Sequence, residues 1–200
     1  MHLAYPLTLT RQKGTSDSIP HPIGPLLRDY AYSPRSHPHS HPCLDPMTLN
    51  QTTSPSLREQ LIASAHRWLS TMNDFTPDAM VSHRTEECVT RPAPRSLGFA
   101  PLNNGQMRAF FKTLTAQMKN FNLALMPGAV PIVDERLRKV VMHLTSYAEA
   151  ACGLYENEYM VVLTFNEEGT LLRDVVEFAD SDYCVKFAER QAAAVESTSI

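Results

Sequence analysis

The chain has 200 residues, of which 43% are apolar and 20% are charged, and its formal net charge is −3. This length and apolar content suit one folded domain with an appendage, while the interspersed charges argue against a nucleic-acid-binding surface, which needs a basic face. Every apolar run is too short to cross a bilayer, so a membrane protein is not expected.

The first segment, residues 1–55, is rich in Pro, His and Ser and shows no sustained hydrophobic period, which predicts a disordered arm. Its "HPHSHP" motif places His37, His39 and His41 at alternate positions. A defined metal site needs ligands on a rigid frame, so no functional metal is expected there. Met47 lies shortly before the first predicted helix, and we consider the hypothesis that translation starts there and that residues 1–46 are a gene-model extension.

Three helices are predicted from residue 56 onward. Ser56 and Glu59 have the spacing of a capping box, and apolar residues recur behind them at intervals of three and four. A short second helix is predicted from residue 77, with proline at its first position. A third follows the cap at Asn103, and its apolar stripe, which includes Phe110 and Phe111, is typical of a core-facing helix. Residues 82–101 lack a clear period and predict a loop or short strand.

After residue 120 the hydrophobic period changes to two, which predicts strands. An interrupted strand is expected at residues 121–133 and a longer one at 136–150. Two further strands, at 154–166 and 170–180, form a hairpin around the turn Glu167-Glu168-Gly169. A final helix at 183–194 precedes an expected flexible tail, 195–200. Helices followed by a mostly antiparallel sheet predict an α+β fold over residues 56–194.

Several short strings carry a resemblance to a known family. They are Pro101-Leu102-Asn103-Asn104, Tyr155-Glu156-Asn157-Glu158-Tyr159, Gly169, Glu177-Phe178-Ala179-Asp180-Ser181 and the loop "HRTEECV…PRSLG". In their order the chain resembles the SnoaL-like proteins of the nuclear-transport-factor-like (NTF2-like) superfamily, of the type found in fungal secondary metabolism, over roughly residues 56–190. The resemblance implies a cone-shaped α+β barrel with a pocket in its open end and dimerisation through the sheet. Members of this superfamily include cyclases, isomerases, dehydratases and hydrolases as well as binding modules, so the fold alone does not give the function.

Acid–base chemistry is the expected mode of catalysis, because the sequence has no metal set, phosphate loop or nucleophile elbow. His143 lies in the middle of an otherwise apolar strand and is the expected proton-transfer residue; the alternatives are a satisfied core histidine or a residue of a dimer interface. Tyr147 lies on the same strand face and is expected to stabilise an enolate oxygen, with a structural role as the alternative.

Glu158 and Glu177 are the expected partner carboxylates, provided that the hairpin places them on one face. A two-residue turn puts Glu158 opposite Ala179 with Glu177 as its diagonal neighbour, and a four-residue loop puts the two glutamates directly opposite each other. A three-residue loop puts them on opposite faces and excludes the pairing. The alternative is that both carboxylates are solvated charges at strand ends.

The loop after the second helix supplies further candidates. His83 is expected as a second acid–base group, and the arginines there as ligands for a carboxylate or enolate oxygen, with ordinary surface charge as the alternative. The expected substrate-binding residues are Arg84, Arg91, Arg95, Phe110, Phe111 and Tyr159.

The resulting hypothesis is a cofactor-independent cyclase, isomerase or dehydratase acting on a polyketide- or terpenoid-derived (meroterpenoid) intermediate. The alternative is a non-catalytic small-molecule-binding or dimeric interaction module with a lumen filled by aromatic side chains. We expect a small-molecule substrate and a homodimer formed through the sheet, with no nucleic-acid or membrane partner. The first residues lack a secretory signal and the four cysteines form no C-x-x-C pair, so a reducing cytoplasmic location with free thiols is expected.

Overall fold

The structure, a computed structural model, describes residues 54–198, with side chains through residue 194. The predictions made for residues 1–53, including the disordered arm, the three histidines and the start at Met47, lie outside the described residues. In the part that is described, no helix combines the length and the apolar character needed to cross a membrane.

The N-terminal helices are α1 (Leu57–Asn73), α2 (Pro77–Met80) and α3 (Asn104–Gln117). The capping box that was predicted at Ser56 and Glu59 is present, because each side chain accepts a hydrogen bond from the other residue's backbone N–H. Asn103 and Gln106 form the same arrangement at the start of α3. The three predicted helices are therefore confirmed, and side-chain caps fix where α1 and α3 begin.

In the described part of the chain, seven strands form one sheet in the order β2-β1-β7-β6-β5-β3, with β4 paired to β5. The strands are β1 (Arg84–Ala93), β2 (Leu102–Asn103), β3 (Met118–Leu125), β4 (Ile132–Asp134), β5 (Lys139–Ala150), β6 (Gly153–Phe165) and β7 (Leu172–Ala179). Strand β1 runs parallel to β7 and every other pair is antiparallel. The predicted α+β class with a mostly antiparallel sheet is confirmed.

Strand β1 corrects the prediction of a loop or short strand in this region. It has ten residues and pairs with β7 along most of its length, with an irregularity between Arg84 and Val89. The bulge and the many charged residues of β1 interrupt the apolar alternation that identifies a strand in a sequence. A short 3₁₀ turn, η1 (Arg95–Leu97), follows it.

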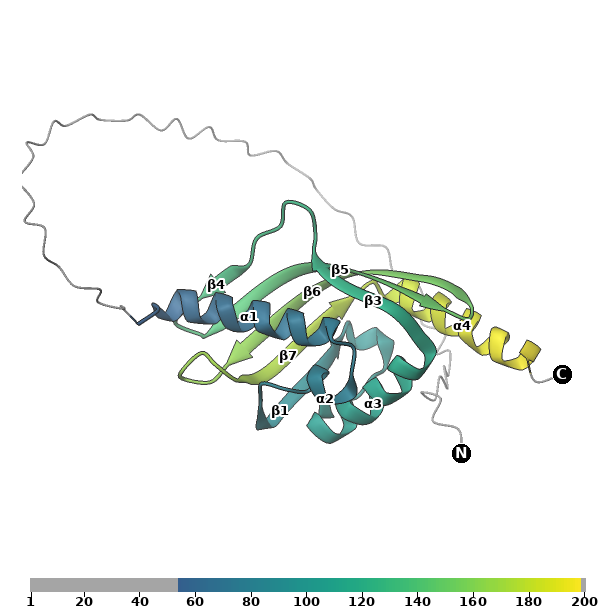
Figure 1. Cartoon of the computed structure of the whole chain (residues 1–200), viewed down its shortest axis with the longest axis horizontal. Helices are drawn as coiled ribbons and strands as arrows, with labels where there is room; N and C mark the ends of the chain where they lie inside the picture. Colours follow the sequence, from purple (N-terminus) through teal and green to yellow (C-terminus); the bar gives the residue numbers. More distant parts are fainter. Residues whose placement is uncertain (1–53, 199–200) are drawn as a thin grey trace, which may run out of the picture. The chain divides into compact units, whose positions relative to one another are not determined.

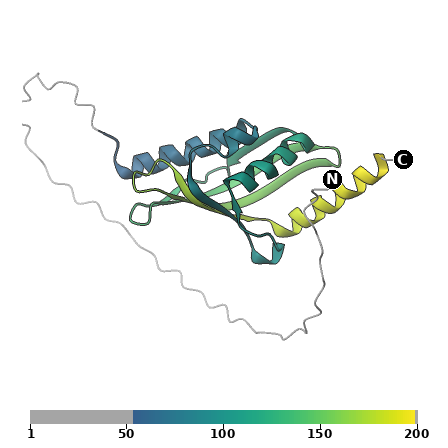
Figure 2. The same ribbon diagram turned by 90° about the horizontal axis from the view of Figure 1, so that it is seen from below.

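Helices α1, α2 and α3 cover one face of the sheet (Figures 1 and 2), which we call the inner face. The inner side chains of β5, β6 and β7 that are buried in the main core are Val140, Met142, Leu144, Tyr159, Val161, Leu163, Phe165, Leu172, Val175 and Ala179. They pack with Trp68 of α1 and with Met107 and Phe111 of α3. Side chains of the opposite phase lie on the outer face.

Helix α4 (Ser181–Thr198) is longer than expected, since it continues beyond residue 194 into the predicted flexible tail. Asp180 accepts hydrogen bonds from the backbone N–H groups of Asp182 and Tyr183 and so caps its start. The sequence before Thr198 contains three consecutive alanines, which favour a helix. Its buried Phe187 packs beside Tyr155 of β6, so the first turns of α4 cover one end of the inner face.

Candidate active site

The pairing of β6 with β7 decides which face each glutamate occupies. Next to the turn, Phe165 lies opposite Leu172, but the following pair is Thr164 with Asp174. Arg173 is therefore an extra residue in β7, and it forms a β-bulge. Beyond the bulge, each side chain of β7 therefore points to the sheet face opposite to the one expected from regular alternation.

Glu177 consequently lies opposite Val161, a buried residue of the inner face, and Tyr159 lies opposite Ala179. Glu158 is one residue out of phase with Tyr159 and lies on the outer face. The predicted pairing of Glu158 with Glu177 is therefore wrong. Both turn lengths that favoured it assumed a regular strand after the turn, and the bulge breaks that assumption.

Glu177 is the acidic group of a polar cluster on the inner face. Burial raises the pKa of its carboxyl group above the ordinary value, and the positive charge of Arg84 opposes that rise. The residue as a whole is partly buried, so solvent still reaches it. A carboxyl group with a raised pKa is a stronger base once ionised, which suits it to proton transfer.

Two tyrosines of β6 lie in electrostatic range of Glu177. The hydroxyl oxygens of Tyr155 and Tyr159 are 2.8 Å apart, and Tyr159 Oη is 3.0 Å from Ser146 Oγ on the neighbouring strand β5. Burial raises the pKa of both phenols, so both remain protonated at neutral pH. They can therefore donate hydrogen bonds to an oxygen or nitrogen that gains negative charge.

Asn157 lies between these tyrosines in the sequence and is also on the inner face, with 5% of its surface exposed. Its Nδ2 donates to Tyr155 Oη at 3.0 Å and to Cys184 Sγ at 3.2 Å, while its Oδ1 accepts from the backbone N–H of Glu158 at 2.8 Å. Because Cys184 belongs to α4, this amide connects the tyrosine pair to the helix that covers the end of the sheet.

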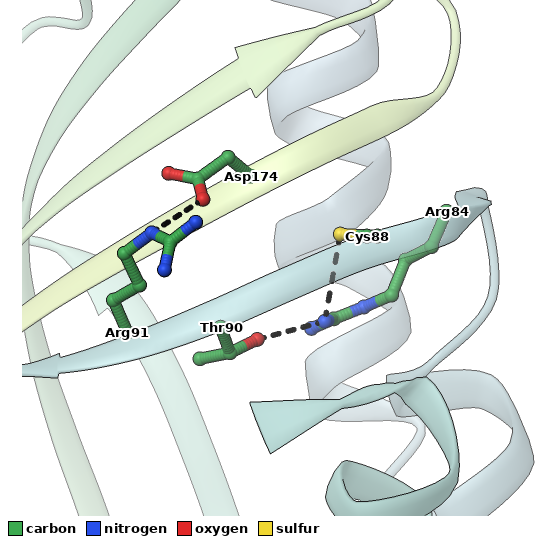
Figure 3. Close-up of polar contacts among 5 residues, drawn as sticks. All are labelled: Arg84, Cys88, Thr90, Arg91 and Asp174. Carbon is green, nitrogen blue, oxygen red and sulfur yellow. Dashed lines mark hydrogen bonds and ion pairs between the residues drawn. The ribbon is translucent and has the colours of Figure 1, made fainter. Parts of the chain in front are cut away.

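Arg84 supplies the positive charge of the cluster. Figure 3 shows its side chain extended along β1, with Nη1 donating to Thr90 Oγ1 at 2.8 Å and to Cys88 Sγ at 3.9 Å. Its Nε is buried and has no hydrogen-bond partner among the described residues. Burial lowers the pKa of the guanidinium, but an arginine remains charged in proteins. Burial raises the pKa of the Cys88 thiol, which keeps it protonated and a poor nucleophile.

His143 and Tyr147, which were expected in the lumen, lie on the outer face of β5. The inner phase of this strand contains Met142 and Leu144, so His143 points the other way. Its Nε2 is 2.5 Å from Glu158 Oε1, and both side chains are partly exposed. The alternation in the sequence separated the two faces of β5 correctly but assigned the lumen to the wrong one.

Two exposed apolar side chains lie on the outer face beside this pair. Met160 and Phe178 are 42% and 52% exposed and, together with the acidic residues Glu158 and Asp180, line a shallow depression of about 200 Å³ between β6 and β7. Such a surface is compatible with the expected dimer through the sheet, which stays a prediction.

The remaining candidates lie away from the cluster. Arg91 forms an ion pair with Asp174 at 2.8 Å, apart from the Arg84 contacts (Figure 3), and both side chains are partly exposed. His83 and Arg95 are exposed. Phe110 and Phe111 pack in the main core. Of the predicted site residues, the structure thus brings together Arg84, Tyr159 and Glu177.

Sequence reasoning missed Tyr155, Asn157 and Ser146. A signal was present, because Tyr155, Asn157 and Tyr159 have the same phase as the apolar residues that complete β6, and Ser146 has the phase of the buried residues of β5. Polar residues in the core phase of a strand indicate a lined pocket or a hydrogen-bonded network.

No family model matches the chain. The austinoid biosynthesis clusters protein H of Penicillium brasilianum is 36% identical over 125 residues, which cover 62% of this chain and 85% of that protein. The crystal structure of the BvnE pinacolase from Penicillium brevicompactum has 95% sequence identity, covers 70% of this chain and 99% of that chain, and superposes with a TM-score of 0.69. The chain belongs to this family of fungal secondary metabolism.

A third relative is named as an enzyme. PrhC of Penicillium brasilianum, a protein named as an isomerase, is 31% identical over 144 residues, covering 70% of this chain and 83% of its own length, and its structure superposes with a TM-score of 0.66. A SnoaL-like polyketide cyclase from Shewanella denitrificans is 10% identical with a TM-score of 0.52 over 63% of this chain and 94% of its own, which is a likeness of fold. The predicted family and NTF2-like fold are confirmed.

Proposed function

We propose that this chain is an isomerase that catalyses a pinacol-type 1,2-carbon shift, without change of oxidation state, on a hydroxylated intermediate of polyketide or terpenoid origin. The class of enzyme follows from its relatives, since one is named a pinacolase and another an isomerase. The observation that carries the proposal is the inner cluster, in which a carboxyl group with a raised pKa, a guanidinium and two protonated phenols share one partly buried surface.

The chemistry of a 1,2-shift matches these groups. In an α-hydroxy ketone or α-hydroxy imine, the hydroxyl loses its proton, a carbon–carbon bond moves to the adjacent C=O or C=N carbon, and a new carbonyl forms at the original carbinol. In the proposed reaction Glu177 takes the hydroxyl proton. The oxygen of the former C=O group, or the nitrogen of the former C=N group, gains negative charge and then a proton. No atom is therefore gained or lost, and no oxidant is needed.

The other side chains would stabilise the charge that develops. Tyr159 and Tyr155 can donate hydrogen bonds to the oxygen or nitrogen that becomes negative, an arrangement that commonly supplies the largest share of such catalysis. The buried Nε–H group of Arg84, which has no hydrogen-bond partner among residues 54–194, can donate to the same atom or to Glu177. The proton held by Glu177 completes the product, directly or through solvent.

The proposal differs from the alternative of a non-catalytic binding module in what happens to a ligand. A binding module needs no base of raised pKa. Burying a carboxyl group beside apolar residues costs stability, and such a cost is typical of a group that is kept for catalysis. Cyclisation that proceeds by proton transfer would use the same groups. Dehydration would differ by the loss of water.

The experiment is incubation of the purified chain with the substrate of the BvnE pinacolase, followed by chromatography and mass spectrometry. A product of unchanged mass and altered retention, with a new carbonyl in its ¹³C spectrum, is expected. A product lighter by one water would replace the proposed reaction with dehydration. Binding of unchanged substrate, seen as quenching of the fluorescence of Trp68 without turnover, would support the binding module.

A further inference from the structure

The hydrogen bonds around Asn157 have a fixed direction. A backbone N–H can only donate, so the atom of the Asn157 side chain that faces the Glu158 N–H must be the oxygen, Oδ1. The other atom, Nδ2, therefore faces Tyr155 Oη and Cys184 Sγ, and an amide nitrogen can only donate. Tyr155 therefore cannot donate its hydroxyl proton to Asn157.

This restriction limits where the phenol protons can go. Tyr155 and Tyr159 share one hydrogen bond of 2.8 Å, which uses one of their two protons. The second proton is directed to Ser146, to Cys184 Sγ or to a bound molecule, since Asn157 already donates to Tyr155 Oη. If Ser146 donates to Tyr159, that second proton is free for the bound molecule.

We infer that Asn157 is a positioning residue, which orients the hydroxyls of Tyr155 and Tyr159 so that the pair donates into the site. The inference rests on the proposed function, because it assumes that the tyrosines donate to a reacting atom. Asn157 itself is held away from that atom by its three bonds to Glu158, Tyr155 and Cys184. Its effect is therefore expected in kcat, with little change in KM.

The test uses two substitutions of nearly equal size. Asn157→Asp keeps the oxygen that accepts from the Glu158 N–H and replaces the donor by an acceptor, so an ionised Asp accepts a hydrogen bond from the Tyr155 hydroxyl. Asn157→Leu removes the donor without adding a charge. On the substrate of the BvnE pinacolase at neutral pH we expect kcat to fall about tenfold in Asn157→Leu, the effect of one hydrogen bond, and further in Asn157→Asp.

The pH profile distinguishes an effect of hydrogen-bond direction at position 157 from an effect of side-chain packing. Protonation turns the new carboxyl group back into a donor, so the ratio of the Asn157→Asp rate to the wild-type rate should rise as the pH is lowered. Taking the ratio cancels the loss of activity that both proteins suffer when Glu177 is protonated. The same ratio for Asn157→Leu should stay flat. Wild-type kcat in both variants, or a flat ratio for Asn157→Asp, would overturn the inference.

A second measurement does not need turnover. A fluorinated tyrosine placed at position 155 reports the pKa of its phenol by ¹⁹F NMR, in the unaltered background and in Asn157→Leu. Loss of a donor to the phenolate should raise that pKa by about one unit. An unchanged value would show that Asn157 does not donate to Tyr155 and would overturn the inference. Absence of turnover by the wild-type chain, by contrast, would refute the proposed function alone.

Discussion

Replacing Glu177 by Gln tests the site with a matched control on the same hairpin, Glu158→Gln. The two glutamates lie on adjacent strands but on opposite faces of the sheet. If Glu177 takes the substrate proton, Glu177→Gln should lower kcat by about 10² to 10⁴, the usual contribution of a general base. That range corresponds to about 3 to 5 kcal/mol in the activation barrier. Glu158→Gln breaks an exposed pair with His143 and should change kcat by less than about twofold.

The pH dependence of activity follows from the direction of the pKa shift. Glu177 must be ionised to accept a proton, and burial raises its pKa above the ordinary value. The acid limb of the kcat/KM profile should therefore lie above the range of an ordinary glutamate, which titrates near pH 4.3. In Glu177→Gln this limb should disappear from the residual activity, whereas Glu158→Gln should retain it.

Glu177→Gln should also stabilise the folded chain, by an amount that depends on pH. A carboxyl group whose pKa is raised on folding binds its proton more tightly in the folded state, so stability is lost as the pH rises through the window between the unfolded and folded values. Gln removes this penalty. Since Arg84 offsets part of it and the residue is partly exposed, we expect a gain of about 1 kcal/mol above the window, which is about 2–4 °C in Tm, and little gain at pH 4.

Two measurements test these expectations for Glu177: the rate of product formation at saturating substrate, and thermal unfolding at pH 4 and pH 8. Full activity in Glu177→Gln, or equal losses in the two glutamine variants, would refute the assignment of the base. A gain in Tm at pH 4 that vanishes at pH 8 would contradict the account of its pKa.

Four further substitutions test other parts of the structure. Tyr159→Phe should lower kcat about 10²-fold, as removal of a donor to a developing charge does, while circular dichroism shows the fold retained; an unchanged kcat would exclude the donor role. Asn73 bridges α1 to β3 by bonding the backbone N–H and C=O of Leu123 at 2.7 and 2.9 Å, so Asn73→Ala should cost about 1–3 kcal/mol in urea denaturation, and an unaltered midpoint would contradict this. Gly169 has φ +71° and an added Cβ would lie 3.2 Å from a side chain of α1, so Gly169→Ala should lower the unfolding free energy by about 1–2 kcal/mol; a stabilised variant would disprove the strain. If the outer face forms the dimer, Phe178→Glu should reduce the mass measured by light scattering to that of one chain of 22.4 kDa, and a mass of two chains would locate the interface elsewhere.

The helices and the antiparallel strands were predictable because their signals are local. The capping boxes at Ser56 and Asn103 depend on side chains three residues apart, and the alternation of β5 and β6 continues for twelve residues or more. Strand β1 was not predictable in the same way, because its partner β7 lies some ninety positions later and its bulge interrupts the alternation.

The site was only partly predictable because it depends on which face of each strand is covered. Alternation correctly assigned His143 and Tyr147 to one face of β5, but a pattern of alternation does not determine which face the helices cover. Glu177 was selected for a pairing that the register excludes, and it reaches the inner face through a bulge that has no local signature. Arg84 was recognised as a candidate ligand, although its position at the start of a ten-residue strand was unexpected.

The bulge at Arg173 also sets how much room the inner face offers. With regular pairing after the turn, β7 would direct Phe178 towards the helices, whereas the extra residue directs Ala179 there and leaves Phe178 52% exposed. A methyl group thus lies opposite Tyr159, where regular pairing would place a benzyl ring. The same extra residue brings Glu177 to this face, so a relative with regular pairing at this point would lose the carboxyl group from the inner face and gain a bulky ring there.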